Sequence, residues 1–339
     1  MVQRMSQQTL ESIAKLAGVS RSTVSRVVNR HPSVSPDVRD RVTQIIKTTG
    51  YRPNSAARKL RSNRSQIIGL VFRQNVNVLF ADPFFPRLTQ GITRVCNESE
   101  YSLMLFVEGN EDKLFDLTSG RGMFDGLIVQ TVSIHDSLIP RLLRRQIPVV
   151  VSGRPAQDIR ATYVDADNEN GAYLAVRHLL KLGRRKISVI TGEMTSTSSI
   201  DRLDGYKRAL REFDIPYDKR LVHESDYLME GGYQATSVLI KQNPDAIFAF
   251  SDTMARGALR ALADRGISVP EQISVIGFDD LPPATNERPM LTTVRQPVRQ
   301  AGQKLVELLL NKISNGSHST EQVIFDTELI VRETCGGAA

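Results

Sequence analysis

The chain has 339 residues, of which 40% are hydrophobic and 24% charged, and this composition is typical of a globular protein with two or three domains. Only two cysteines are present, Cys96 and Cys335, which excludes a disulfide framework or a cysteine zinc site and indicates reduced thiols. No apolar run approaches the roughly 18 residues that span a bilayer, and the N-terminus has no apolar signal region. We therefore expect a cytoplasmic protein with no membrane partner.

Charge is unevenly distributed along the chain. Residues 1–64 contain 13 Lys or Arg and three acidic residues, a net charge of +10, so the whole-chain charge of +7 leaves −3 for the remainder. A basic head on a mildly acidic body is typical of a nucleic-acid binder. A solubilising tail is the alternative, but a tail would lack the helix caps and apolar periodicity of this segment.

Two short amphipathic helices are predicted at the start of the head. Thr9 can cap a helix that continues to Ala17, because apolar residues recur at helical spacing between them, and Gly18 ends it. Ser20 can cap a second helix over residues 21–29, which places its valines on one face. A short turn between two such helices predicts a helix-turn-helix.

The second helix is expected to face DNA. Its first turn exposes Arg21 and Ser22, and Ser25 and Arg26 lie near them at helical spacing. Arginine suits the two acceptors of guanine in the major groove. A third helix is predicted over 35–50, where a serine cap precedes a proline at the first helical position.

Residues 54–64 form a short, basic, helix-prone stretch with one large apolar residue, Leu60. A helix of this length would be mostly unformed alone in water. The stretch is either a solvated linker or a hinge that folds on DNA and inserts Leu60 between base steps of the minor groove.

The body alternates apolar strands with amphipathic helices. Such strands, alternating with helices, predict parallel sheets covered on both faces. About 275 residues is large for one sheet, so two lobes with a ligand in the cleft between them are expected. The strands are predicted at 67–72, 101–107, 126–130, 148–152, 186–191, 246–250 and 274–278, and helices include 169–182 and 202–211.

The head resembles the DNA-binding head and hinge of the lactose/galactose repressor (LacI/GalR) family. The resemblance is carried by IAKLAGVSRSTVSRVVNRHPSVSPDVRDRV and by GYRPNSAARKL, about fifty positions in all. It implies that Arg21 and Ser22 are the variable base-reading pair, that Arg26 contacts a base, and that Ala57 and Leu60 enter the minor groove. The DNA-binding residues that we predict are Thr9, Ser20, Arg21, Ser22, Thr23, Ser25, Arg26, Asn29, Asn54, Ala57 and Leu60.

The body is similar to the same family over nearly its whole length, for example in DGLIVQ, IPVVVSGRP, RLDGYKRAL and SVIGFDDLPPA. The implied fold is an all-α helix-turn-helix head followed by an α/β two-lobed domain of the periplasmic-binding-protein type. The implied parts are a head at 1–53, a hinge at 54–64 and an effector-binding domain at 65–339. The first lobe would comprise about 65–163 and 293–323, and the second about 164–292 and 324–339.

The resemblance also implies an effector site in the cleft. Arg202 and Asp279 match the family's effector-binding arginine and aspartate, with the alternative that they pair only as scaffold. Their chemistry suits a polyol, since Asp279 accepts hydrogen bonds from hydroxyls, Arg202 donates, and Tyr227 or Phe84 can stack on a sugar face. The full set of predicted ligand-binding residues is Phe84, Gln130, Ser196, Ser198, Arg202, Tyr227, Ser251, Asp279 and Gln296.

One stretch of the body departs from the family pattern, and two serines match only some members of the family. The stretch between Val107 and Phe124 is shorter than usual, so a truncated helix is expected there. Serines at 196 and 198 are as in sugar-responsive members, whereas purine-responsive members have larger groups. A carbohydrate effector is therefore predicted, together with a homodimer on pseudo-palindromic double-stranded operator DNA.

Two other classes of protein fit the sequence less well. A periplasmic binding protein would carry a secretion signal and lack the basic head. An α/β enzyme fused to a head needs a catalytic constellation, and no phosphate loop, Gly-x-Ser-x-Gly elbow or His-Glu-x-x-His site is present. Asp279-Asp280 could serve acid/base or metal chemistry in an enzyme, but ligand binding is favoured. We expect no enzymatic activity, no cofactor and no metal.

Overall fold

The computed structural model describes residues 9–28, 31–51, 64–73, 76–107, 110–118, 123–130, 133–316 and 319–336. It divides into two compact units, Met1–Ser65 and Gln66–Ala339. No helix among the described residues is both long enough and apolar enough to cross a membrane.

The first unit is a three-helix head, as predicted, made of α1 (Leu10–Ala17), α2 (Arg21–Val28) and α3 (Pro36–Thr49). Thr9 and Ser12 form a reciprocal capping box at the start of α1, and Gly18 ends that helix with a left-handed φ of 63°. Ile13, Val24 and Val42, one from each helix, are fully buried and form the centre of the core. The apolar periodicity therefore folds the head around a core of its own.

Two predicted caps of the head differ in detail. Ser20 accepts a hydrogen bond from the backbone N–H of Thr23 at 3.1 Å, which satisfies one free donor of α2. Ser35 occupies the cap position of α3 but makes no side-chain cap bond, and Pro36 starts that helix instead.

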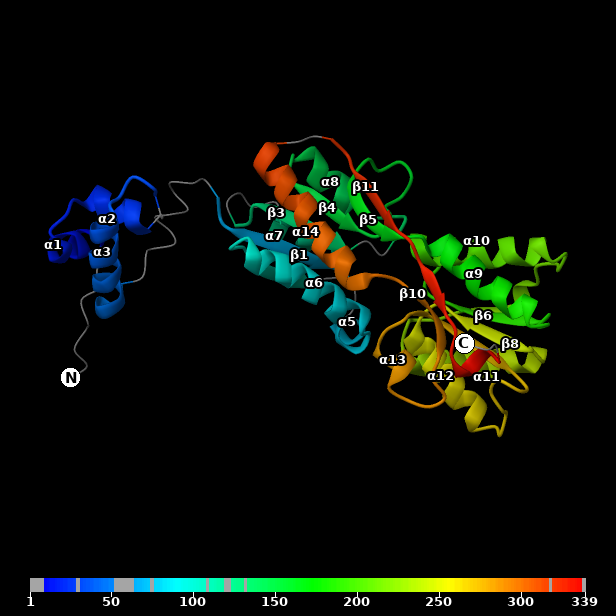
Figure 1. Cartoon of the computed structure of the whole chain (residues 1–339). Helices are drawn as coiled ribbons and strands as arrows, with labels where there is room; N and C mark the ends of the chain where they lie inside the picture. Colours follow the sequence, from blue (N-terminus) through cyan, green and yellow to red (C-terminus); the bar gives the residue numbers. More distant parts are fainter. Residues whose placement is uncertain are drawn as a thin grey trace, which may run out of the picture. The chain divides into compact units, whose positions relative to one another are not determined.

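The first lobe of the second unit is a parallel six-stranded sheet with helices on both faces (Figure 1). Its strand order is β11-β5-β4-β3-β1-β2, and successive side chains of β1 enter cores on opposite faces. Its elements are β1 (Ile67–Phe72), α5 (Val76–Ala81), α6 (Phe84–Glu98), β2 (Ser102–Val107), α7 (Glu111–Thr118), β3 (Gly126–Gln130), α8 (Leu138–Arg144), β4 (Val149–Ser152), β5 (Thr162–Ala166), α14 (Val298–Asn315) and β11 (Gln322–Phe325).

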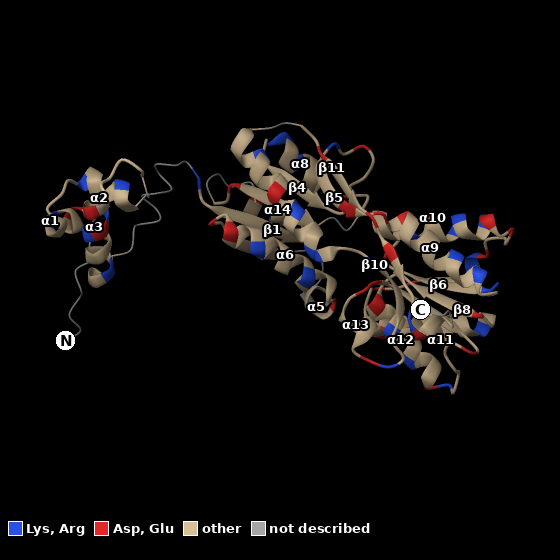
Figure 2. Cartoon of the chain, in the orientation of Figure 1, with Lys and Arg blue, Asp and Glu red and all other residues tan. Residues whose placement is uncertain are grey.

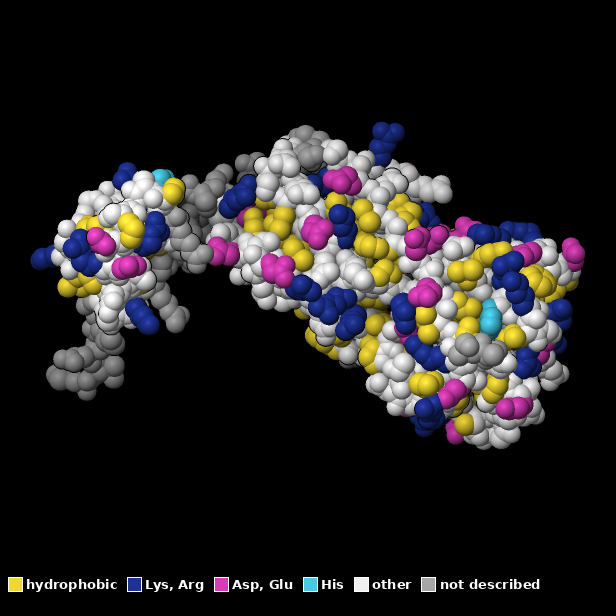
Figure 3. Space-filling model, in the orientation of Figure 1, with side chains coloured by type: hydrophobic (Ala, Val, Ile, Leu, Met, Phe, Trp, Pro, Cys, Tyr) yellow, Lys and Arg dark blue, Asp and Glu magenta, His cyan; other side chains and the backbone are white. Residues whose placement is uncertain are grey.

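The second lobe repeats this design with the strand order β12-β10-β9-β8-β6-β7, in which only β12 is antiparallel to its neighbour. Charged side chains of both signs are interspersed over its visible face (Figure 3). Its elements are α9 (Asn168–Lys181), β6 (Ile187–Thr191), α10 (Thr197–Glu212), η1 (Lys219–Leu221), β7 (Val222–Glu224), α11 (Met229–Leu239), η2 (Ile240–Gln242), β8 (Ala246–Ala249), α12 (Asp252–Ala263), β9 (Ser274–Asp279), α13 (Pro282–Thr285), β10 (Thr292–Arg295), β12 (Glu328–Ile330) and η3 (Glu333–Cys335).

The chain passes between the lobes after β5, after β10 and between β11 and β12. The family resemblance predicts these crossings after about 163, 292 and 323; in the structure β5 ends at Ala166, β10 of the second sheet ends at Arg295, and β11 ends at Phe325. The short helix expected between Val107 and Phe124 is α7, with eight residues.

Candidate functional site

The polar face of α2 is the candidate DNA-reading surface of the head. Arg21, Ser22 and Arg26 are exposed, whereas the valines of the same helix face the core. Arg21 forms an ion pair with Glu11 across 2.8 Å, and both side chains are more than half exposed. Exposed pairs contribute little to stability, so Arg21 can exchange this partner for DNA at small cost. Figure 2 shows Lys and Arg on α2 and α3.

The other head residues predicted to bind DNA have mixed positions. Thr9 and Ser20 are helix caps, and Thr23 and Ser25 are partly buried on α2. Four of the predicted residues lie outside the described residues, so their contacts with DNA stay predictions: Asn29, Asn54, Ala57 and Leu60.

A cavity of about 340 Å³ lies where the carboxyl ends of strands from both lobes meet. Eight of the nine residues predicted to bind ligand line it: Phe84, Gln130, Ser196, Ser198, Arg202, Tyr227, Asp279 and Gln296. Ser251 is the exception. It is buried behind the cavity, where its hydroxyl accepts a hydrogen bond from the Met254 N–H and caps α12.

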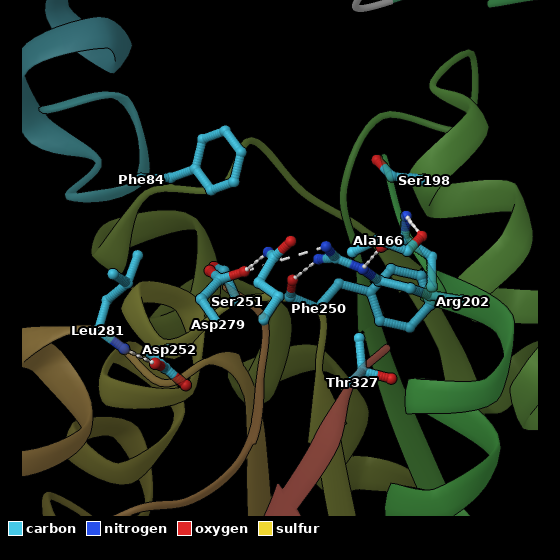
Figure 4. Close-up of polar contacts among 12 residues, drawn as sticks. Phe84, Ala166, Ser198, Arg202, Phe250, Ser251, Asp252, Asp279, Leu281 and Thr327 are labelled. Carbon is cyan, nitrogen blue, oxygen red and sulfur yellow. Dashed lines mark hydrogen bonds and ion pairs between the residues drawn. The ribbon is translucent and has the colours of Figure 1, made fainter. Parts of the chain in front are cut away.

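Arg202 is held rigidly at the floor of the cavity (Figure 4). Its Nε donates to Asn168 Oδ1 at 2.9 Å, its Nη1 donates to the Phe250 carbonyl, and its Cζ lies 3.7 Å from the centroid of the Phe278 ring. Its side chain is 7% exposed. These contacts fix the guanidinium plane while leaving Nη2 to face the carboxylate of Asp279.

Asp279 faces Arg202 from the end of β9. Its Oδ1 lies 3.9 Å from Arg202 Nη2 and accepts a hydrogen bond from Gln296 Nε2 at 2.5 Å. Burial raises the pKa of Asp279 well above its ordinary value, against the opposing effect of Arg202. Its φ of 116° is unusual for a residue other than glycine, and such strain commonly marks functional positions.

The neighbouring carboxylate, Asp280, points elsewhere. Its two oxygens pair with Arg332 Nη2 at 2.5 Å and with Arg295 Nε at 2.7 Å. The Asp279-Asp280 pair is therefore divided between the cavity and an ion-pair cluster, so the two carboxylates do not act together on one ligand or metal.

Tyr227 and Phe84 bring aromatic surface to the cavity from different lobes. The Tyr227 hydroxyl is 2.7 Å from Ser199 Oγ, and the ring packs so tightly on Gly192 that a Cβ there would lie 2.0 Å from it. Figure 4 shows Phe84 projecting into the space between the lobes, with Ser198 across that space. Two fixed aromatic faces suit the apolar faces of a ring-shaped ligand.

Several polar residues of the cavity were not predicted from the sequence, and three of them act on Arg202. Asp82 is 6% exposed and precedes α6, and burial raises its pKa to about 6. Asp165 is the penultimate residue of β5, and burial likewise raises its pKa to about 6. Asn168 begins α9 and orients Arg202. The available signal was their position directly after strands or before helices, at the edge where parallel strands end.

The lobes are also joined at the rim of the cavity. Arg154 of the first lobe pairs with Asp201 of α10 at 2.5 Å, and its carbonyl accepts a hydrogen bond from the Thr197 hydroxyl at 2.6 Å. The backbone N–H of Ile134 donates to the carbonyl of Thr195 at 2.7 Å. These contacts hold the lobes in the orientation that encloses the cavity.

A helix-turn-helix unit joined to a two-lobed unit with a polar cavity defines a regulator of transcription that responds to a small molecule. A family profile described as "Bacterial regulatory proteins, lacI family" matches residues 9–54, and one described as "Periplasmic binding protein-like domain" matches residues 176–335. The HTH-type transcriptional regulator CelR of Thermobifida fusca is 35% identical over 98% of this chain and 100% of that protein.

Solved structures agree over the whole chain. A "transcriptional regulator CelR-cellobiose complex" is similar with a TM-score of 0.76 at 33% identity, covering 96% of this chain and 99% of that one. The lac repressor dimer bound to operator and the anti-inducer ONPF is similar with a TM-score of 0.82 at 26% identity, covering 97% and 99%. The chain therefore belongs to the lacI family and is a DNA-binding transcriptional regulator.

Proposed function

We propose that the regulator is controlled by a carbohydrate effector bound between its lobes. The observation that carries this proposal is the fixed Arg202 guanidinium beside the Asp279 carboxylate, with Gln296, Ser196 and Ser198 around them. Together they offer donors and acceptors at spacings that suit adjacent hydroxyls. The similarity to a regulator solved with cellobiose supports the same class of ligand.

The effector is expected to be found by thermal unfolding of the full chain in a carbohydrate panel that begins with cellobiose. A ligand at a hundred times its Kd stabilises the folded state by about 2.7 kcal/mol. Operator affinity measured with and without each stabilising sugar then shows whether the ligand releases or promotes DNA binding. Stabilisation without any change in operator affinity would contradict the regulatory role of the cavity.

The basic head should make operator binding strongly dependent on salt. Its net charge of +10 implies many phosphate contacts, each of which releases counterions. With six or more contacts, operator affinity should fall on the order of 10³-fold between roughly 50 and 200 mM salt. Fluorescence anisotropy across this range measures the slope, and a flat response would argue against the head as the DNA-binding part.

We propose a homodimer that pairs through the β2 edge of the first lobe, because two heads double the DNA site. Phe80 and Leu105 are 68% and 45% exposed there and line a groove with side chains of α6. An exposed apolar edge of this kind is normally covered. The relative solved on its operator is a dimer, which supports the same assembly here.

Leu105→Glu is expected to shift this dimer to monomer by placing a charge in its interface, and to weaken operator binding at least tenfold. Light scattering gives the mass, and anisotropy gives the affinity. Ile324→Glu is the matched control, since Ile324 is 54% exposed on β11 at the opposite edge of the same sheet. A monomeric wild type, or a Leu105→Glu protein that remains dimeric, would contradict this interface.

A further inference from the structure

The lining of the effector cavity is unbalanced in charge. It contains five acidic residues and two arginines, namely Asp82, Asp165, Glu193, Asp226, Asp279, Arg73 and Arg202. Glu193 and Asp226 are exposed at the rim, whereas Asp82 and Asp279 are buried. The ligand's own charge therefore has to be compatible with an acidic enclosure.

The positive charges of the two arginines are matched or exceeded by those of the carboxylates near them. Arg73 is neutralised by two carboxylates, since its Nη2 lies 2.5 Å from Glu111 Oε1 and its Nη1 lies 2.6 Å from Asp136 Oδ2. Arg202 interacts electrostatically with Asp82, Asp165 and Asp279, whereas Arg154 acts on Asp165 only and is already paired with Asp201. Around the Arg202 guanidinium, carboxylates therefore outnumber cations, and Asp82 and Asp279 have this arginine as their cationic partner among the described residues.

Helix N-termini at the cavity favour an anion and so oppose the effect of the carboxylates. Helices α6, α9, α10 and α14 begin among the lining residues, at Phe84, Asn168, Thr197 and Val298, and helix N-termini attract negative groups. However, at the start of α10 the Ser196 and Ser198 hydroxyls bond to each other at 2.8 Å, and Glu193 precedes the same turn. Since each helix terminus carries about half a charge, the four termini and Arg202 together do not offset the five carboxylates of the lining.

We propose that the cavity selects an uncharged polyhydroxylated ligand and excludes its phosphate esters, with Asp82 as the first-lobe residue that enforces this selection. The inference rests on the proposed sugar function of the same cavity. Asp82 holds its place because its Oδ1 accepts the Phe84 N–H at 3.0 Å, next to the ring that projects between the lobes. Burial raises the pKa of both carboxyl groups, so a phosphate entering between Asp82 and Asp279 either faces like charge from both lobes with water excluded or requires the carboxyl groups to take up protons.

The first test compares matched pairs by calorimetry on the full chain: cellobiose, glucose, ribose and trehalose, each against its phosphate ester. We expect every phosphate ester to bind at least a hundredfold more weakly than its parent sugar wherever the parent binds. An ester that binds as tightly as its parent overturns the charge selection but leaves the sugar function standing. If none of the four parent sugars binds, the second test decides the inference.

The second test uses inorganic phosphate and needs no knowledge of the effector. In Asp82→Asn/Asp279→Asn, Arg202 loses two of its three carboxylates, so phosphate should bind at least tenfold more tightly than to wild type. Asp204→Asn/Glu307→Gln removes the same charge from exposed side chains outside the cavity lining and should match wild type. The single variant Asp82→Asn keeps the Phe84 hydrogen bond and should show part of the gain. Equal phosphate affinity in all four proteins would overturn the proposal.

Discussion

Asp279→Ala is expected to abolish the effector response while leaving the DNA-reading head intact. The carboxylate faces Arg202 and Gln296 at the floor of the cavity, so its loss removes the acceptor for ligand hydroxyls. Two hydrogen bonds to a charged group are worth about 3 kcal/mol or more, which is on the order of a hundredfold in effector affinity.

The expected operator binding depends on the direction of control. If the effector releases wild type from DNA, the variant should bind the operator as wild type does and ignore the effector. If the effector promotes binding, the variant should fail to bind even when effector is added. Asp204→Ala, on an exposed part of α10, is the matched control and should respond normally. An Asp279→Ala protein with the full wild-type response would remove this cavity from consideration as the effector site.

Gly205→Ala should strongly destabilise the second lobe and displace Arg202 with it. A Cβ at this position would lie 2.1 Å from the Glu169 carbonyl oxygen and 2.9 Å from the Ala172 Cβ, so α9 and α10 would have to separate. Overpacking of this kind costs about 3 kcal/mol, which corresponds to a fall of roughly 6–12 °C in the melting temperature of a domain of this size.

Separation of α9 and α10 would affect ligand binding, because each helix carries one partner of a hydrogen bond that positions Arg202. Arg202 stands on α10, and Asn168, which accepts its Nε–H, stands on α9. Effector affinity should therefore fall together with the melting temperature, whereas Lys207→Ala on the outer side of α10 should change neither by much. If Gly205→Ala unfolds within a degree of wild type, the helix pair can move apart without cost.

Regular elements were predictable wherever local chemistry decides them. Helices α1 and α2 begin at side-chain caps, α1 and α3 end at glycines, and the buried strands of both sheets are apolar runs that periodicity detects. Five strands were missed: β5, β7, β10, β11 and β12. Several are three or four residues long or carry polar side chains, such as Thr292 and Thr293 of β10, because they lie at the crossings and sheet edges. Their pairing depends on the neighbouring strand, which periodicity does not report.

Some cavity residues could be predicted from the sequence, and others could not. Arg202 and Asp279 stand in recognisable motifs, so resemblance could place them. Asp82 and Asp165 stand in no such motif, and only the folded chain brings them to one guanidinium. Ser251 also follows a strand, but it is not among the lining residues, because its hydroxyl caps the next helix.

The rim contacts between the lobes have a consequence for the rate at which the effector leaves. A ligand enclosed by the Arg154–Asp201 pair and the Ile134–Thr195 backbone bond can escape only when those contacts break. The exit rate of a tightly enclosed sugar is then limited by the opening of the lobes, so chemically different effectors should share similar residence times even where their affinities differ. Transcription would follow a falling effector concentration only as fast as this rim opens.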